Sequence, residues 1–379
     1  MPHLNVLKVC IGMLWCVQEE FRIRPVVSSV IFLRIFDYVD PELNAFLPIT
    51  SFRNYFSPTT GAKTWGEGPF NEQLANYGPE YDVCWVNLPW NGLGDLQQSA
   101  EYVAYGIKHF ASLSHASGNK INVIAHSQGA GANVQWALTF WPSLKPLVLN
   151  FFAIAGTFKG AMEAYPMCLV ENLWGGCMPS PLQLKPNSKY MKAQNSEADE
   201  YSGANAQVKT TSIFSIYDQV VQWEGSKGKA SYLKGATMLS LQSEKLCGKG
   251  HIVGHLGIAE DLATLKIIQA IIPPSNPISN ELDNFDKSSC RHLGGLWLKL
   301  ISRWTYVLNV GMNFAVGPAR MHKLFNEFAH LKNLDKHGNI LHRHIQRVAK
   351  EPGLQSYVCE RGYATDCLPS NATFADLRE

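Results

Sequence analysis

Residues 120–138 read KINVIAHSQGAGANVQWAL. Residues 120–125 form an apolar run of the kind that fills a buried strand, and residues 130–138 have the spacing of an amphipathic helix. The turn between them, HSQG, has Ser127 as its second residue. A tight strand-to-helix turn needs small residues, because it holds the serine in a strained conformation with its hydroxyl above the sheet. We therefore predict that Ser127 is a nucleophile; the alternative is a serine that only caps the helix.

The chain around this turn alternates short apolar runs with helix-length segments. The apolar runs lie at residues 82–88, 120–125, 149–155 and 211–217. This alternation predicts an α/β fold with a mostly parallel central sheet and helices on both faces. We divide the chain into an appended segment (1–45), a catalytic core (46–275), and a remainder (276–379) made of a polar linker, a helical insertion over 290–350 and a C-terminal tail.

A serine nucleophile needs a base and an orienting carboxylate, which follow in the order serine, acid, histidine in hydrolases built on such a sheet. Asp218 ends the apolar run 210–217 and would lie on the edge where Ser127 emerges, although an aspartate after a strand is also a common turn former. His255 lies in a glycine-bounded loop ahead of a helix that we expect to begin near Ile258. His251 is the competing base, and a supporting or surface role is its simpler interpretation.

The amino-acid composition limits the possible binding partners and the cellular compartment of the protein. The chain has 379 residues, 46% of them hydrophobic, and a net charge of +2, with no dense run of Lys and Arg that could follow a phosphate backbone. Nucleic acid is therefore not an expected partner. Nine cysteines fit no paired zinc pattern and favour disulfides in an oxidising compartment, with at least one thiol unpaired. The apolar stretch from Val6 to Val17 is too short to span a bilayer and lacks clear signal-peptide features, so secretion or membrane attachment through it remains a minor alternative.

Seven short motifs together resemble the Candida antarctica lipase B-like lipases and esterases of fungi and some bacteria. The carriers are TTG (59–61), CWVNLP (84–89), EYVAY (101–105), SQG (127–129), QWAL (135–138), TTSI (210–213) and DQVVQ (218–222). The resemblance implies an α/β-hydrolase, with Ser127 as nucleophile, Asp218 as acid and His255, over His251, as base. It implies a cofactor-free serine hydrolase of acylglycerol-like or small esters, with transient contact to a lipid interface and no obligate protein partner.

The same resemblance implies an oxyanion site at which the chain departs from the family pattern. The backbone N–H of Gln128 and the loop residue Ser57 would hold the oxyanion. Phe56 and Pro58 stand where the family has glycines, and Thr157 stands where it usually has an aspartate. The alternative to an active esterase is therefore a lipase-like protein that keeps the triad but has a defective oxyanion loop and first strand.

Two disulfides follow from the resemblance. The tail GYATDCLP (362–369) resembles that of the family and implies a bridge between Cys247 and Cys367. Cys168 and Cys177 form a second candidate pair, in a segment similar to one in fungal members. Together with the cysteine content, the resemblance predicts an extracellular protein.

The first 45 residues carry a different resemblance. LKVCIGMLWCVQEE (7–20) is similar to the final helices of plant receptor-like kinase domains, but the glycine-rich loop, VAIK, HRD and DFG motifs of a kinase are absent from the sequence. We expect this segment to contribute nothing to catalysis and to pack loosely or irregularly on the hydrolase body. In the rival account, the β-branched residues 29–36 supply the strand that the sequence lacks before Ser57.

Overall fold

A computed structural model describes residues 14–16, 29–33, 70, 73–74, 81–172, 176–218, 220–221, 230–255, 257–272, 285–291, 333–334, 340–341 and 347–370. Ser57 lies outside them, as do most of the first 45 residues and most of the predicted helical insertion.

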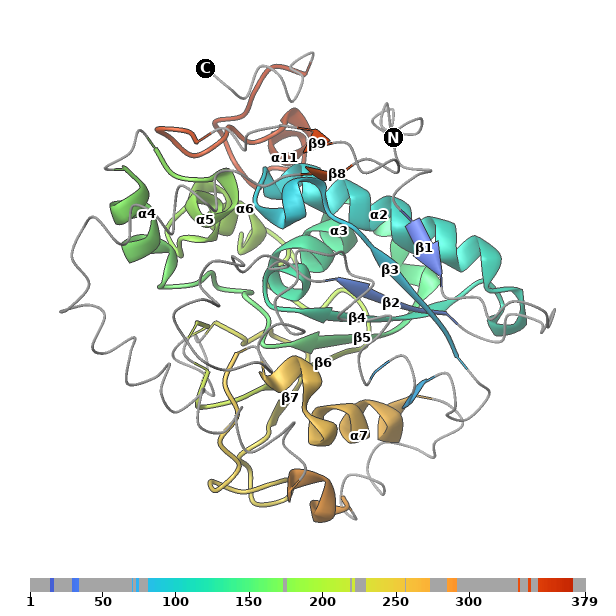
Figure 1. The fold of residues 1–379 in the computed structure, drawn as a ribbon. Helices are drawn as coiled ribbons and strands as arrows, with labels where there is room; N and C mark the ends of the chain where they lie inside the picture. The colour runs from blue at the N-terminus through green and yellow to red at the C-terminus, as the bar shows by residue number, and fades with distance from the viewer. Residues whose placement is uncertain are drawn as a thin grey trace.

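Seven strands form the central sheet in the order β1-β3-β2-β4-β5-β6-β7, and all pair in parallel except the edge strand β1 (Figure 1). The strands are β1 (Leu14–Cys16), β2 (Ser29–Leu33), β3 (Asp82–Val86), β4 (Ile121–His126), β5 (Val148–Ile154), β6 (Thr210–Phe214) and β7 (Thr237–Ser240). Strands β3, β4, β5 and β6 lie where the four apolar runs predict them.

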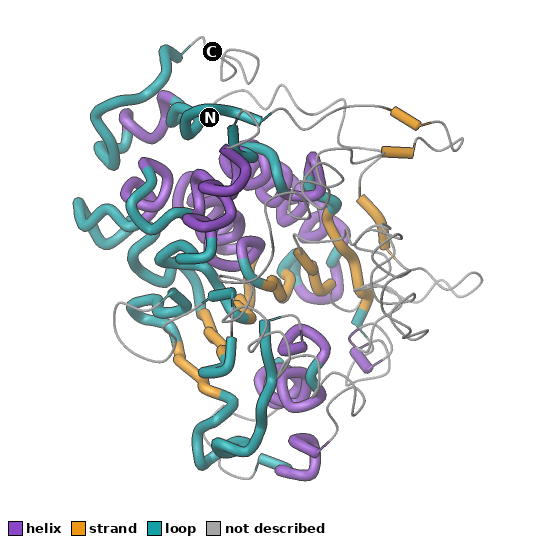
Figure 2. Tube along the Cα trace, turned by 60° about the vertical axis from the view of Figure 1, so that its left-hand side comes forward, coloured by secondary structure: helices purple, strands orange, loops and turns teal. Residues whose placement is uncertain are grey.

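Helices lie on both sides of this sheet, with α2 and α3 above it and α7 below it in Figure 1; Figure 2 shows the same layers from another side. The α-helices are α2 (Leu96–Leu113), α3 (Gln135–Phe140), α4 (Ala164–Asn172), α5 (Pro179–Leu184), α6 (Lys189–Gln194), α7 (Leu262–Ile271) and α11 (Ser356–Glu360). Shorter turns are the 3-10 helices η5 (Pro89–Gly92), η6 (His115–Ser117), η8 (Pro142–Leu147), η9 (Gly257–Glu260) and η10 (Lys287–Arg291), and the π-helix η7 (Gly129–Val134).

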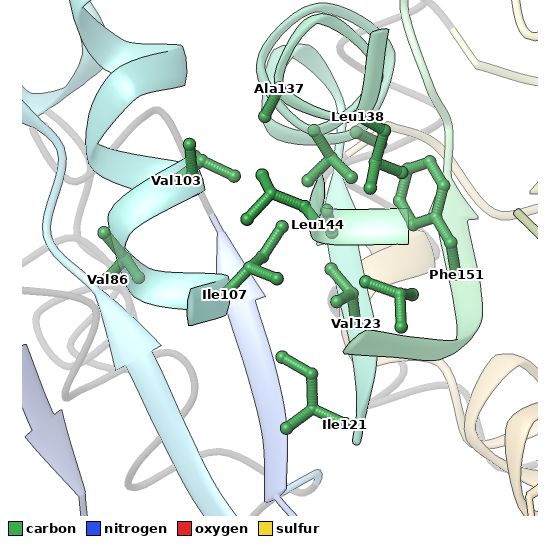
Figure 3. Packing of buried hydrophobic residues seen from close by; sticks show 14 of the residues in the cluster. Val86, Val103, Ile107, Ile121, Val123, Ala137, Leu138, Leu144 and Phe151 are labelled. Atoms are coloured by element: carbon green, nitrogen blue, oxygen red, sulfur yellow. The ribbon is translucent and has the colours of Figure 1, made fainter. Parts of the chain in front are cut away.

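Strands β3, β4 and β5 are buried on both faces, and their side chains divide between two cores. Val123 and Phe151 pack with Val103 and Ile107 of α2 in the upper core, which Figure 3 shows from close by. The residues that follow them in β4 and β5 point the other way and pack against α7 in the lower core. This pattern explains why the strands read as continuous apolar runs, as is typical of parallel sheets covered on both sides.

Residues 29–33 occupy an inner position of the sheet. β2 pairs in parallel with β3 on one side and with β4, the strand that leads to Ser127, on the other. The expectation that the head of the chain packs loosely or irregularly is therefore wrong for these residues, and the rival account of a recruited strand holds for them. The reason is that a strand is needed between β3 and β4, and this segment is apolar and β-branched enough to fill it.

The C-terminal tail packs on the helix that follows the Ser127 turn. Arg361 donates to the carbonyl oxygens of Thr139 and Phe140, at 3.3 and 3.1 Å, and so binds the end of α3. The indole of Trp136 donates to the hydroxyl of Tyr357 at 3.1 Å. Within the predicted helical insertion, the described residues 333–334 and 340–341 form the short antiparallel pair β8 (Asn333–Leu334) and β9 (Ile340–Leu341), so the helical prediction is wrong there.

Three disulfides join described cysteines. Cys168 and Cys177, one of the two candidate pairs, are bridged. The predicted bridge between Cys247 and Cys367 is wrong: Cys247 is bonded to Cys290, with Cα atoms 5.5 Å apart, and Cys367 to Cys359, with Cα atoms 6.1 Å apart. Each cysteine can form one bridge, and in both cases a nearer segment supplies the partner. The tail is thus cross-linked within itself and not to the loop that carries His255.

Candidate active site

The Ser127 turn is a strained strand-to-helix elbow. Ser127 has a φ of 58°, a backbone angle that residues other than glycine rarely adopt. Its N–H donates to the carbonyl of Ile154 at 2.8 Å, and its carbonyl accepts from Ala130 and Gly131 at 3.1 and 2.9 Å. The helix predicted over 130–138 begins as the π-helix η7 and continues as the α-helix α3; π-helical turns are frequent at functional sites.

Gly131 permits a close approach beside the elbow. A Cβ atom on this residue would lie 2.1 Å from the backbone nitrogen of Thr157, closer than any real contact. The N–H of Thr157 donates to the carbonyl of Ser127 at 3.3 Å. The Gly/Ala-rich sequence after Ser127 therefore lets the loop after β5 pack directly on the nucleophile turn.

His255 lies between Ser127 and Asp218. Its Nδ1 is 2.7 Å from Asp218 Oδ2, and its Nε2 is 2.8 Å from Ser127 Oγ. Asp218 Oδ1 accepts from the N–H groups of Val220 and Val221, at 2.8 and 2.7 Å, so the carboxylate is held in place. With Asp218 ionised, Nδ1 carries the proton, which leaves the Nε2 lone pair to accept from the serine hydroxyl. The structure thus brings the three predicted triad residues together, and all three are buried.

The segment that carries His255 has little regular structure, and side chains hold its backbone. The carbonyl of His251 accepts from Gln242 Nε2 at 2.8 Å, and the carbonyl of Val253 accepts from Ser215 Oγ at 2.6 Å. Gln242 also donates to Ser215 Oγ at 3.0 Å. Because Ser215 lies three residues before Asp218, this network ties the acid loop to the base loop.

His251 is held in a second histidine–aspartate contact away from the serine. Its Nε2 is 3.2 Å from Asp261 Oδ2, and its Nδ1 is 3.1 Å from the carbonyl oxygen of Cys290. Asp261 also accepts from the N–H of Thr264 and so caps α7. His251 therefore connects the loop, helix α7 and the Cys247–Cys290 bridge.

Of the two oxyanion candidates, Gln128 is described and Ser57 is not. Gln128 follows the nucleophile directly and is 1% exposed. Its side chain donates to the carbonyl of Gly92 at 2.8 Å, which fixes the start of the π-helix against η5. Thr157 Oγ1 is buried beside the elbow without a hydrogen-bond partner among the described residues.

One further carboxyl group influences the electrostatics near Asp218. Burial is the main cause that raises the pKa of Glu163 to about 7; a hydrogen bond from its own backbone N–H opposes the shift, and the charge of Asp218 adds to it. Glu163 immediately precedes α4. Sequence reasoning did not single out Glu163.

Sequence reasoning also missed the polar residues that hold the base loop. Ser215, Gln242 and His126 are buried, and each donates to a backbone carbonyl of residues 251–255. A polar side chain within or next to an apolar run is the available signal, because a buried polar group needs a partner. That signal marks such residues but does not name their partners.

Neither a metal site nor a membrane-spanning helix is found in the described part of the chain. No group of three or more His, Cys, Asp or Glu side chains is arranged there to bind a metal ion. The helices described above are too short or too polar to cross a bilayer.

Comparison with known proteins places this geometry in a known fold. No protein-family model matches the sequence. Lipase B of Pseudozyma antarctica is 30% identical over 203 residues, which are 52% of this chain and 54% of lipase B, so the match spans about half of that relative. The crystal structure of Aspergillus fumigatus lipase B is similar with a TM-score of 0.57 and 23% identity, over 77% of this chain and 62% of that chain. The chain has the α/β-hydrolase fold.

In α/β-hydrolases the nucleophile, acid and base follow one another along the chain at the carboxyl ends of the strands. Ser127 follows β4, Asp218 lies shortly after β6, and His255 follows β7. The order and the sheet positions of the three residues therefore agree with the fold.

Proposed function

We propose that the chain is a serine carboxylic ester hydrolase that works through an acyl-enzyme on Ser127. The observation that carries the proposal is the continuous hydrogen-bonded path from Ser127 Oγ through His255 to Asp218. The similarity to two lipases B supports an ester as substrate.

The chemistry follows from the proton positions. His255 Nε2 takes the proton of Ser127 as Oγ attacks the ester carbonyl, and Asp218 holds the imidazole and stabilises its positive form. His255 then protonates the leaving alcohol as the carbon–oxygen ester bond breaks. A water molecule, deprotonated by the same imidazole, attacks the acyl-enzyme and releases the acid. The N–H of Gln128 would donate to the oxyanion in both steps, with Ser57 as the proposed second donor.

We propose acylglycerol-like or small esters as substrates, and an oxidising, extracellular compartment. The compartment is supported by the three disulfides, which are rare in reducing compartments. The competing proposal is a protein that keeps the triad but lacks a working oxyanion loop. It is motivated by Phe56 and Pro58, which replace glycines of the lipase pattern. Loss of one oxyanion donor costs roughly a hundred- to a thousandfold in rate.

Two assays on the purified full chain separate these proposals. Turnover of p-nitrophenyl butyrate measures the complete reaction, and labelling by a fluorophosphonate measures the activated serine. We expect both activities in the wild type, neither in Ser127→Ala, and both in the control Ser99→Ala, which removes a buried hydroxyl on α2. Labelling without turnover would favour the impaired protein, and labelling that survives Ser127→Ala would overturn the assignment of the nucleophile.

A further inference from the structure

His126, the residue before the nucleophile, contacts the base directly. Its Nε2 is 2.8 Å from the backbone carbonyl oxygen of His255, and the two imidazole rings are 4.6 Å apart at an angle of 42°. A carbonyl oxygen can only accept, so His126 Nε2 carries a proton and donates it to this hydrogen bond. His126 is 2% exposed and is the last residue of β4, so its backbone is held by the sheet.

Alternate backbone carbonyls of the base loop accept hydrogen bonds from side chains, and His126 donates the one at His255 itself. The carbonyls of residues 251 and 253 accept from Gln242 and Ser215, which belong to the side of the sheet that carries Asp218. The carbonyl of His255 accepts from the strand that carries Ser127. Gln242 and Ser215 thus connect the base loop to the acid loop, and His126 connects it to the strand that leads to the nucleophile.

We propose that His126 is a positioning residue that fixes His255 relative to Ser127. The proposal rests on the proposed function, because it concerns how the base of that reaction is held. Ser127 and His126 are neighbours in the chain, so a bond from His126 to the backbone of His255 constrains the distance between the base and the nucleophile. Displacement of a reacting group by about 1 Å can cost roughly a hundredfold in rate, and the loss of one hydrogen bond corresponds to about tenfold or less.

The alternative is that His126 only fills space in the core. The two roles differ in what a variant must retain. A filler needs the ring volume, whereas a positioning donor needs an N–H group near the place of Nε2. His126→Phe keeps the ring and removes the donor, and His126→Gln keeps a donor at a similar reach from the backbone.

The test compares steady-state kinetics on p-nitrophenyl butyrate and the fluorophosphonate labelling rate, well below the unfolding temperature of each variant. We expect His126→Phe to lower kcat about tenfold with little change in KM, to slow labelling in parallel, and His126→Gln to stay within about threefold of the wild type. His251→Gln serves as the matched control: it disturbs a buried histidine of the same loop and should lower stability without slowing kcat. Should His126→Phe fail to fold, His126→Asn replaces it, since its shorter side chain brings the N–H short of the carbonyl.

Three results would overturn the proposal. The first is a His126→Phe enzyme with wild-type kcat, in which case Ser127 labelling of the wild type would show that the proposed function stands. The second is a His126→Gln enzyme that is slowed as much as His126→Phe, because a retained N–H donor would then restore nothing. If the wild type neither turns over esters nor reacts with the probe, the proposed function fails, and the low-field NMR resonance of the His255 Nδ1 proton still reports on positioning. That resonance should then change in His126→Phe and persist in His126→Gln, and an identical resonance in all three proteins is the third contrary result.

Discussion

Two histidines that lie four residues apart in one loop, His251 and His255, each contact a buried aspartate. His255 contacts Asp218 at 2.7 Å, and His251 contacts Asp261 at 3.2 Å, with side chains that are 1% exposed or less in both pairs. By residue type and burial alone the two pairs are alike. What separates them is the atom opposite the other ring nitrogen.

That atom is a hydroxyl in one pair and a carbonyl in the other. Ser127 Oγ can donate a proton to His255 Nε2, so this ring has one donor, one acceptor and a path for a proton. The carbonyl of Cys290 and the carboxylate of Asp261 can only accept, so neither nitrogen of His251 faces a hydroxyl from which it could take a proton. The comparison teaches that the partner on the far nitrogen, and not the His–Asp contact, distinguishes a catalytic pair from a structural one.

Replacement of each aspartate by asparagine is the strongest test of this difference. In Asp218→Asn the amide can no longer orient and stabilise the protonated form of His255, and we expect kcat to fall roughly 10³- to 10⁴-fold. In Asp261→Asn, kcat per folded molecule should stay within about twofold of the wild type. Steady-state ester hydrolysis measures both variants. A similar loss of kcat in the two would contradict the division between catalytic and structural pairs.

The structural pair should be visible in stability. Asp261→Asn keeps a side chain that can cap α7 but removes the charge opposite His251, and we expect the free energy of unfolding to fall by about 3 kcal/mol. Urea unfolding with the disulfides intact measures the change. Thr264→Ser, which keeps the side-chain contact to Asp261, is the matched control and should change the free energy of unfolding little. A stable Asp261→Asn protein would show that His251 and Asp261 hold nothing together.

The elements that carry the triad could be predicted because their signals are local. The apolar runs 120–125 and 210–217 correspond to strands at 121–126 and 210–214, and the small residues after Ser127 match an elbow with a φ that strains other residues. The order of serine, acid and histidine then limits the candidates to a few residues. Only the contacts of the rings separate His255 from His251 by geometry.

The contacts between distant segments could not be predicted in the same way. Cysteine spacing does not fix connectivity, so the resemblance of the tail suggested a partner for Cys247 that the path of the chain does not bring close. The strand at residues 29–33 was obscured by a kinase-like pattern, and its place in the sheet depends on the gap between β3 and β4. The hydrogen bond from His126 to His255 likewise joins residues 129 positions apart.

Glu101 on α2 extends the comparison to a partly buried carboxyl whose charged neighbour is another acid. Burial, and to a lesser extent the charge of Asp95, raises the pKa of Glu101 to about 7 from an ordinary value near 4.5. The folded state therefore binds more protons between about pH 4.5 and 7, so stability is full below this range and declines as pH rises through it. Glu101→Gln should remove about 1–2 kcal/mol of the decline between pH 5 and pH 8. Urea unfolding at the two pH values measures it, and parallel curves for the variant and the wild type would contradict the assignment.

The smallest effect is expected at Glu163. Its charge interacts with Asp218, which belongs to the His255 pair. Its Oε2 is buried without a hydrogen-bond partner among the described residues, and burial raises its pKa to about 7. Above that pH Glu163 carries a negative charge that interacts with the charge of Asp218. Two unit charges about 10 Å apart in water repel by ~0.4 kcal/mol, which corresponds to about twofold in rate. We therefore expect Glu163→Gln to raise kcat/KM for the anionic ester p-nitrophenyl hemisuccinate about twofold at pH 8 and hardly at all at pH 5.5. The neutral p-nitrophenyl butyrate is the control substrate and should respond equally little at both pH values. A gain that is the same for both esters, or the same at both pH values, would show that the carboxylate of Glu163 does not act on the substrate through its charge.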